Sequence, residues 1–422
     1  MFRENRKKLL DRIKDNSIVV LFANKNINTT NADQYYPYIP NSNFYYFTGI
    51  NQSESILILL KKNNVTKELL FIEKRNPLQV IWNGHVLSDD KAKEISGISG
   101  IKELDSFNDS FHTLAGDMEN IYLHLNKITT KHPHLYNHNK NFIDSCREKF
   151  PFHSICSITK EIQALRTYKS DFEIDLIKKA ASITSESYRE LTQHIKPSIS
   201  ENALEVELQY QLRTRGASGF AYEPIFGGGI NSCILHYTDN NKVLKEGEIL
   251  LIDAAAEYKN YKSDVTRTYP ISGKFTSRQK DVYNAVLRVL EQATKYIKAG
   301  KTMKEVQCFA CNIMQEELAA LKLIEKDEMV EVTAENVCDH ALAFKKYYMH
   351  NIGHHIGLDT HDDCDPKLPL QNGAVVTIEP GIYIPKERIG IRLEDMIHIK
   401  QDTTHNLTSD IPIAIDDIEW GK

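Results

Sequence analysis

Four acidic residues in the second half of this 422-residue chain have the spacing expected of a metal site. Asp253 and Asp264 lie in one segment, and Glu379 and Glu394 lie in a second. Each acid stands within or beside a run of apolar residues, where neighbouring ionised carboxylates repel unless a cation neutralises them. Four such carboxylates need more than one positive charge, so the pattern indicates a pair of metal ions. The alternative is that these acids lie on solvated strand faces, where most acids lie.

Each acidic segment has the pattern of a β-hairpin. Residues 248–269 carry apolar and β-branched residues on both sides of a Tyr-Lys-Asn-Tyr turn, and folding about that turn brings Asp253 opposite or nearly opposite Asp264. Residues 374–399 fold in the same way about the turn at 385–388, and Glu379 then faces Glu394. The two hairpins are therefore expected to offer two carboxylates each to one place.

A histidine cluster lies between the hairpins, in MHNIGHHIGLDTHD at residues 349–362. We expect a strand here, in which Gly353 and Gly357 allow another backbone to approach closely. A lone histidine is usually a structural residue, but several beside four acids are candidates for metal binding or catalysis. The candidates in this cluster are His350, His354 and His361.

Composition excludes several classes of protein. The chain is 41% apolar and 26% charged with a formal net charge of −5, and its lysines are interleaved with acids, so no nucleic-acid partner is expected. The longest apolar run near the start, Ile18 to Ala23, is too short for a signal peptide or a membrane span. Seven scattered cysteines argue against a disulfide framework. We therefore expect a cytoplasmic protein that does not enter a membrane.

The pattern changes near residue 160. Residues 1–160 alternate predicted strands and helices, which is typical of an α/β domain. After this point Ser170 begins a capping box that opens a long helix, and later helices come in pairs, each pair associated with one acidic hairpin. A helix-plus-hairpin unit used twice predicts an α+β catalytic domain at residues 161–422, with a curved antiparallel sheet and helices outside.

The acidic and histidine motifs together resemble a known family, the pita-bread metallopeptidases, and within it the Xaa-Pro aminopeptidases. The stretch NADQYYPYIPNSNFYYFTG at residues 31–49 resembles the N-terminal domain of that family, which single-domain methionine aminopeptidases lack. The resemblance implies a smaller N-terminal α/β domain for oligomerisation and cleft closure, followed by a pita-bread domain with a pseudo-twofold helix-hairpin repeat. The motifs that carry the resemblance are LIDAA at Asp253, SDVTRT at Asp264, GHHIG at His354, TIEPG at Glu379 and RLED at Glu394.

The resemblance implies a dinuclear metal centre. Asp264 and Glu394 would bridge the two ions, Asp253 would hold one of them, and His354 and Glu379 would hold the other. One imidazole with four carboxylates makes an oxygen-rich site suited to Mn²⁺, although Co²⁺, Fe²⁺ or Zn²⁺ could bind. Two such ions can hold a bridging hydroxide that attacks the scissile carbonyl, and Glu379 would also carry the proton.

Other residues take roles by the same resemblance. His236 and His361 would contact the substrate and stabilise the tetrahedral oxyanion. His350, aided by Tyr383, would shape the pocket that receives proline.

Two arginines and two N-terminal residues complete the candidate site. Arg166 and Arg392 fall where the family places arginines that organise the site, and for Arg392 we favour the orientation of a ligand carboxylate. Asp33 and Trp82 match positions that close over the cleft of a neighbouring subunit, which implies a homodimer or homotetramer. Trp82 could instead be a half-buried aromatic residue of its own domain.

The resemblance predicts an Xaa-Pro aminopeptidase, which releases the N-terminal residue from peptides with proline in second position. The nearest alternative is prolidase, which uses the same ligands but is restricted to Xaa-Pro dipeptides. An alternative of another class is a non-catalytic peptide-binding module on the same fold. Such a module would be expected to have lost one or more ligands, whereas all five are present here.

Overall fold

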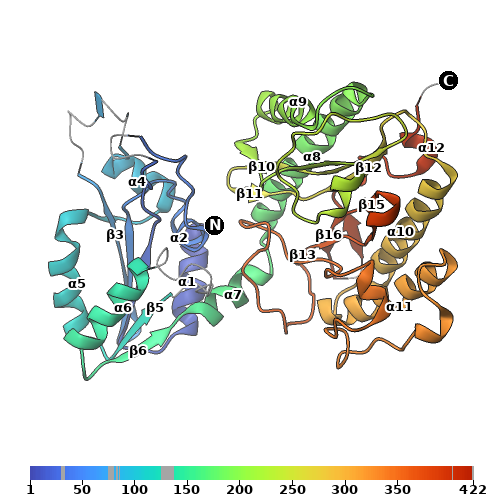
Figure 1. The fold of residues 1–422 in the computed structure, drawn as a ribbon. Coiled ribbons are helices and arrows are strands. Elements are labelled where there is room, and N and C mark those ends of the chain that lie inside the picture. Colours follow the sequence, from blue (N-terminus) through green and yellow to red (C-terminus); the bar gives the residue numbers. More distant parts are fainter. Residues whose placement is uncertain are drawn as a thin grey trace. The chain divides into compact units, whose positions relative to one another are not determined.

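The chain forms two compact units, Met1–Leu165 and Arg166–Lys422, in a computed structural model (Figure 1). The structure describes residues 1–29, 34–74, 80–81, 84, 86–124, 137–401 and 403–420. Asp33 and Trp82 lie outside these residues. Within the described part of the chain, no helix is long and apolar enough to cross a membrane.

The first unit is built on a six-stranded mixed sheet in the order β4-β3-β2-β1-β5-β6. The pairs β1–β2 and β2–β3 are antiparallel, and the remaining neighbours are parallel. Its elements are α1 (Phe2–Arg12), β1 (Ser17–Phe22), α2 (Ser42–Thr48), β2 (Ile56–Lys62), β3 (Val65–Ile72), α4 (Asp89–Ser96), β4 (Gly100–Glu103), α5 (Phe107–Gly116), β5 (Asn120–Leu123), α6 (Asn137–Lys149) and β6 (Ser154–Ser157). Helix α7 (Thr159–Thr167) begins in this unit and ends in the second.

Helices cover both faces of this sheet, as Figure 1 shows. Alternate strand residues such as Ile18, Ile58 and Phe71 pack with α5 and α6 in one hydrophobic cluster. On the other side α1 is tied to the sheet by Lys61, which donates to two carbonyls at the end of that helix. The first unit thus has a core of its own, as the strand pattern predicts.

The second unit consists of antiparallel strand pairs and two pairs of helices. α8 packs on α9, and α10 packs on α11, so each predicted helix pair is present. The elements of this unit are α8 (Asp171–Leu191), α9 (Glu201–Thr214), β7 (Gly219–Phe220), β8 (Ile225–Gly228), β9 (Ile249–Asp253), β10 (Ala256–Tyr258), β11 (Tyr261–Lys262), β12 (Thr266–Pro270), α10 (Ser277–Tyr296), α11 (Met303–Ala320), β13 (Val375–Ile378), β14 (Gly381–Ile384), β15 (Ile389–Arg392), β16 (Asp395–Ile399), β17 (Thr404–Asn406) and α12 (Ile415–Ile418).

Local sequence explains where these elements begin and turn. Ser170 and Glu173 form the predicted capping box at the start of α8. Lys259 and Asn260 both have positive φ, 48° and 68°, which makes the tight turn that joins β10 to β11. Arg388 also has a positive φ of 59° and ends the turn between β14 and β15.

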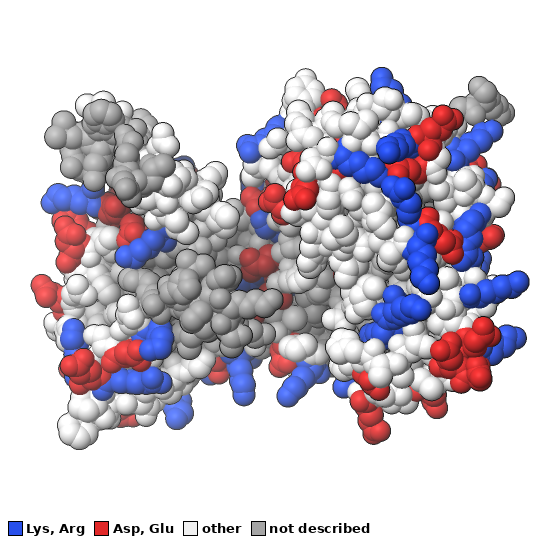
Figure 2. Space-filling view, viewed as in Figure 1, with Lys and Arg blue, Asp and Glu red and all other residues white. Residues whose placement is uncertain are grey.

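Basic and acidic side chains lie side by side over the face of each unit that is drawn in Figure 2. Many of them form exposed ion pairs, for example Lys91 with Glu94 and Lys74 with Glu103. Exposed pairs of this kind contribute little to stability, about 0 to 1 kcal/mol each. The hydrophobic clusters of the two units therefore dominate the stability of the fold.

Candidate metal centre

The two hairpins place their acids by strand register. Asp253 at the end of β9 pairs with Thr266 at the start of β12, so Asp264 lies two residues away from the position opposite Asp253. In the second hairpin, Ile378 pairs with Asp395 and Gly381 pairs with Arg392. Continuing either register puts Glu379 opposite Glu394, whereas the two aspartates are diagonal neighbours.

A short contact joins the two hairpins. The backbone N–H of Glu394 donates to the carbonyl of Thr266 at 3.0 Å, and the Thr266 hydroxyl donates to Glu394 Oε2 at 2.7 Å. Because Thr266 follows Asp264 by two residues, this contact brings Glu394 of the second hairpin to the acids of the first.

The histidine segment runs beside β13 without forming the predicted strand. Only His355 makes a β-bridge, with Val376, although Thr377 N–H donates to the His354 carbonyl at 2.8 Å and Glu379 N–H to the Ile352 carbonyl at 2.7 Å. A Cβ on Gly353 would lie 1.9 Å from the Thr377 carbonyl oxygen. Glycine is therefore required there, as the predicted close approach implies.

Four of the five candidate ligands meet at one place. One ligand atom each from Asp264, His354 and Glu394 lie within 4.8 Å of one another. His354 Nε2 is 3.4 Å from Asp264 Oδ2 and 3.6 Å from Glu379 Oε1. Asp253 stands beside them: its Oδ2 accepts from Arg392 at 2.6 Å, and its buried Oδ1 has no hydrogen-bond partner.

These donors fit divalent metal ions. His354 Nδ1 lies 3.1 Å from the His355 carbonyl, which places the proton on Nδ1 and leaves the Nε2 lone pair facing the carboxylates. The orphaned Asp253 Oδ1 is a buried carboxyl oxygen, and such atoms are rare unless an ion or water satisfies them. Hard carboxylate oxygens with one imidazole suit Mn²⁺ and related ions.

The electrostatics of the acids suit a site for cations. Burial and the charge of Asp253 raise the pKa of Asp264 well above its usual range. Burial and Asp264 do the same to the pKa of Glu394, as do burial and Glu394 to that of Glu379. Burial lowers the pKa of His354 to about 4, and His361 adds to this effect. Without cations the acids resist ionisation, while the imidazole is a neutral ligand at physiological pH.

Arg392 connects this cluster to the predicted proline pocket. It donates to Asp253 Oδ2, to the Tyr383 hydroxyl at 2.9 Å and to the Thr266 hydroxyl at 3.2 Å. The Tyr383 hydroxyl in turn lies 2.9 Å from His350 Nε2. Arg392 therefore orients a candidate ligand and a predicted pocket residue at once.

The two other histidines lie around the same point. The His361 ring centroid is 4.1 Å from that of His354. His236 interacts electrostatically with both His361 and His350. Both His236 and His361 are exposed, as groups that meet a substrate must be.

Arg166 occupies a different position. Its buried guanidinium is paired with Asp362 Oδ1 at 2.5 Å and Asp359 Oδ2 at 2.7 Å. These two carboxylates flank His361 in the sequence, so Arg166 anchors the end of the histidine segment through its two ion pairs. Its predicted contact with substrate stays a prediction.

Sequence reasoning missed several partners of the ligands. Thr266 bonds to Glu394, and Tyr222 hydrogen-bonds to the carboxylate of Asp264. A buried ion pair, Arg267 with Asp395, lies next in sequence to Thr266 and Glu394. The sequence did contain a signal for this ion pair. In the motifs SDVTRT and RLED, a basic residue and an acidic residue each interrupt an apolar strand, and each directly follows a residue of the contact between the hairpins.

Comparison with known proteins agrees with this geometry. A family model described as metallopeptidase family M24 matches residues 175–401, and one described as aminopeptidase P, N-terminal domain, matches residues 2–122. An Xaa-Pro aminopeptidase of Escherichia coli is 31% identical over 99% of this chain and 96% of its own. A Bacillus anthracis structure described as an aminopeptidase P has a TM-score of 0.90 with 35% identity, covering 99% of this chain and 96% of that one. E. coli aminopeptidase P with the inhibitor Pro-Leu has a TM-score of 0.86 with 30% identity, again covering 99% and 96%.

Proposed function

The chain belongs to metallopeptidase family M24, and from this premise we propose that it is an Xaa-Pro aminopeptidase, releasing the N-terminal residue from peptides with proline in second position. Its pita-bread catalytic domain follows a smaller N-terminal domain. The observation that carries the proposal is the convergence of Asp264, His354 and Glu394 within 4.8 Å of one another. These groups come from both hairpins and from the histidine segment between them.

Five side chains hold the metal in this proposal. Asp253, Asp264, His354, Glu379 and Glu394 would together hold two divalent ions. When bound, divalent ions lower the pKa of a water molecule so that it attacks at neutral pH, and they polarise the attacked carbonyl. The excess of carboxylate oxygens favours Mn²⁺ over the softer ions.

The remaining side chains move protons and stabilise charge. Glu379 takes a proton from the attacking water and passes it to the proline nitrogen as the C–N bond breaks. His236 and His361 donate to the oxygen of the tetrahedral intermediate. Arg392 holds the Asp253 carboxylate in position through its 2.6 Å hydrogen bond.

His350 and Tyr383 form the proline pocket. The ring of His350 is 5.5 Å from that of Tyr383 and 4.9 Å from that of Tyr348. Both tyrosine rings are buried and pack edge-to-face against His350, so in this proposal they hold the partly exposed His350 ring in place to meet a pyrrolidine ring. A proline nitrogen brings no N–H to the scissile bond, so recognition of its ring replaces recognition of a donor.

Residues 1–160 serve oligomerisation and cleft closure in this proposal, and residues 161–422 carry the chemistry. Asp33 and Trp82 reach a neighbouring subunit of a homodimer or homotetramer in a cytoplasmic enzyme, and Arg166 contributes to substrate binding. Light scattering on the intact protein measures the subunit number. A monomer that is fully active contradicts the role of Asp33 and Trp82.

Peptide hydrolysis tests the function directly. Protein loaded with Mn²⁺ is expected to cleave Xaa-Pro-Xaa tripeptides and longer peptides, and to leave matched peptides with alanine in second position intact. Equal cleavage of both series overturns the proposal. Cleavage confined to Xaa-Pro dipeptides makes the protein a prolidase, and metal binding without any hydrolysis makes it a binding module.

Two variants control this assay. Asp264→Asn should abolish turnover, because an amide cannot replace a bridging carboxylate. Asp281→Asn, on α10 outside the candidate site, should leave turnover unchanged. Full activity of Asp264→Asn contradicts the assignment of the site.

A further inference from the structure

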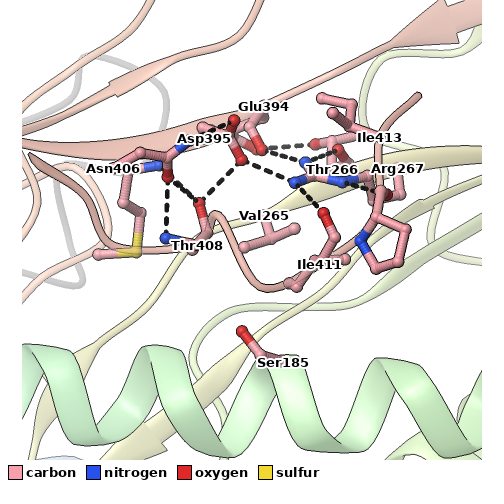
Figure 3. A network of polar contacts seen from close by, with 12 residues as sticks. Ser185, Val265, Thr266, Arg267, Glu394, Asp395, Asn406, Thr408, Ile411 and Ile413 are labelled. Carbon is pink, nitrogen blue, oxygen red and sulfur yellow. Dashed lines mark hydrogen bonds and ion pairs between the residues drawn. The ribbon is translucent and has the colours of Figure 1, made fainter. Parts of the chain in front are cut away.

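A buried ion pair lies beside the contact that joins the two acidic hairpins. Arg267 of β12 and Asp395 of β16 are 1% and 6% exposed, and Arg267 Nη2 is 2.7 Å from Asp395 Oδ1. Figure 3 shows the pair between the strands, with Glu394 beside it. Each member follows, by one residue, one of the two residues that join the hairpins, Thr266 and Glu394.

Arg267 uses every donor it has within the protein. Nη1 donates to the carbonyls of Glu394 at 2.6 Å and Thr266 at 3.1 Å. Nη2 donates to Asp395 and to the Ile411 carbonyl at 3.1 Å, and Nε donates to the Pro412 carbonyl at 3.2 Å. A guanidinium has five N–H groups, so none remains for a substrate.

Asp395 is equally occupied. Oδ1 accepts from Arg267 and from the Thr408 hydroxyl at 2.8 Å, and Oδ2 accepts from Asn406 Nδ2 at 2.7 Å. Successive residues of a strand point to opposite faces, so Asp395 points away from the side on which Glu394 meets the other ligands. Asp395 is therefore not a further metal ligand.

The place where Arg267 acts is the junction between the hairpins. The same guanidinium nitrogen holds the carbonyls of Thr266 and Glu394, and Thr266 also binds Glu394 through its backbone and its hydroxyl. Asp264 is two residues from Thr266. A change in this junction would alter the separation of Asp264 and Glu394, the two ligands that come from different hairpins.

We propose that Arg267 and Asp395 are positioning residues that fix Glu394 relative to Asp264 and thereby set the affinity of the centre for its second metal ion. The proposal rests on the dinuclear centre of the proposed function. Substitution of residues that orient metal ligands typically changes metal affinity by about 10- to 100-fold. The role is geometric, since neither side chain contacts metal or substrate.

Arg267→Lys separates geometry from charge. Lysine keeps the positive charge, but one ammonium group cannot reproduce five N–H groups in a rigid fork. Calorimetric titration of metal-free, full-length protein with Mn²⁺ should show the second equivalent bound about 10- to 100-fold more weakly than in the wild type. At two added equivalents of Mn²⁺, electron paramagnetic resonance of the variant should show a larger share of isolated Mn²⁺ and a smaller share of exchange-coupled pairs than the wild type.

Arg6→Lys is the matched control. Arg6 is fully buried in the first unit, where it pairs with Glu68 at 2.9 Å and donates to the Phe47 carbonyl. Its substitution should lower thermal stability and leave Mn²⁺ affinity and the resonance spectrum unchanged. Equal Mn²⁺ affinity of Arg267→Lys and wild type overturns the proposal.

A milder variant covers the case in which Arg267→Lys does not fold. Asn406→Ala removes a half-buried donor to Asp395 Oδ2 and leaves the ion pair in place. It should weaken the second Mn²⁺ by a few-fold, and an unchanged second affinity contradicts the proposal. If the wild-type protein binds only one equivalent of Mn²⁺, the dinuclear centre of the proposed function is wrong. If the wild type and all variants bind two equivalents equally well, the dinuclear centre stands and only the role of Arg267 and Asp395 is wrong.

Discussion

The hydrogen bonds around Tyr383 determine which protons the proposed proline pocket carries. Arg392 donates to the Tyr383 hydroxyl, so the hydroxyl proton is left to donate to His350 Nε2. The His350 Nδ1–H then donates to the Asn351 carbonyl at 2.8 Å. Burial and the charge of Arg392 lower the pKa of His350 to about 3, and burial raises that of Tyr383 to about 12. Both pocket residues are therefore neutral where a peptidase works, and the tautomer of His350 is fixed.

Tyr383→Phe should disrupt this arrangement. The loss of one hydroxyl leaves a buried Arg392 N–H and His350 Nε2 without their partner, which should cost about 1 to 3 kcal/mol of unfolding free energy. KM for Xaa-Pro peptides should rise more than kcat falls, because the ligands are untouched. Chemical denaturation and steady-state kinetics measure the two effects.

Tyr269→Phe is the control for that variant. Tyr269 is 2% exposed, and its hydroxyl has no hydrogen-bond partner among the described residues. Removing an unsatisfied buried hydroxyl should leave stability unchanged or raise it. Equal losses in Tyr383→Phe and Tyr269→Phe would show that the hydroxyl contacts of Tyr383 are irrelevant.

At the scale of residues, sequence predicts the acids and histidines but not their partners. Asp253 ends an apolar strand and Glu394 lies between two others, where a charged residue is itself a signal. Thr266 and Tyr222 are ordinary residues whose hydrogen bonds depend on how two distant segments meet. Such contacts become visible only when the hairpins are placed together.

At the scale of elements, the hairpins were predictable because register follows from the turn. The turn at Lys259 and Asn260 fixes the register in which Tyr258 pairs with Tyr261 and Asp253 pairs with Thr266. The histidine segment was predicted as a strand and is irregular, because alternation of residue types also suits an extended chain that meets its neighbour at only a few points. Gly353, which admits the Thr377 carbonyl, is the residue that makes the difference.

One helix supports the loop that carries His236. Glu201, the first residue of α9, is fully buried, and its carboxylate accepts from Gly228 N–H at 2.7 Å, Tyr237 hydroxyl at 2.8 Å and Lys242 N–H at 2.9 Å. Glu201→Gln replaces one accepting carboxylate oxygen with an amide NH₂ group, which cannot accept a hydrogen bond from these donors. It should cost about 1 to 3 kcal/mol of stability and lower kcat, while Mn²⁺ affinity is kept.

Glu205→Gln is the comparison for Glu201→Gln. Glu205 lies one turn further along α9 and accepts a single hydrogen bond, from Asn240 at 2.9 Å. We expect a smaller loss of stability and nearly normal turnover. If Glu201→Gln loses stability but keeps full kcat, the loop does not depend on Glu201 for the position of His236.

Strand β16 also contains a buried histidine that should destabilise the protein in acid. Burial and the nearby Lys178 lower the pKa of His398 from 6.5 to about 4. The unfolded chain therefore binds a proton at His398 before the folded chain does, and stability present above pH 6.5 is lost as the pH falls toward 4. The loss should reach about 3 kcal/mol.

His398→Phe should remove that part of the pH dependence. The neighbours of His398 that carry charge or titrate, which are Lys178, Lys400, His405 and Asp171, stay in place. Unfolding free energies of the two proteins, measured by denaturation from pH 7.5 to 4.5, should converge or cross in favour of the variant as the pH falls. Parallel curves would mean that His398 does not titrate with folding.

At the scale of the whole molecule, the two units have separate cores. The hydrophobic cluster around Ile58 and Phe107 lies within Met1–Leu165, and the one around Leu250 and Val286 lies within Arg166–Lys422. A domain with its own core can in principle fold and unfold alone. Sequence predicted a change of pattern near residue 160, because alternation of strands and helices gives way there to paired helices.

Hydrogen exchange should show how metal binding is distributed over the chain. A ligand that binds only the folded state stabilises it by about 2.7 kcal/mol at about 100 times its Kd, which slows exchange through unfolding by about 100-fold. Addition of Mn²⁺ to metal-free protein should therefore protect peptides from 248–270 and 374–399 strongly. Peptides from β1, β2 and β3 should exchange at the same rate with and without metal, because opening of their core does not release the ions. Protection spread equally over both units would contradict the assignment of the metal to the second, and its absence from both hairpins would contradict the site.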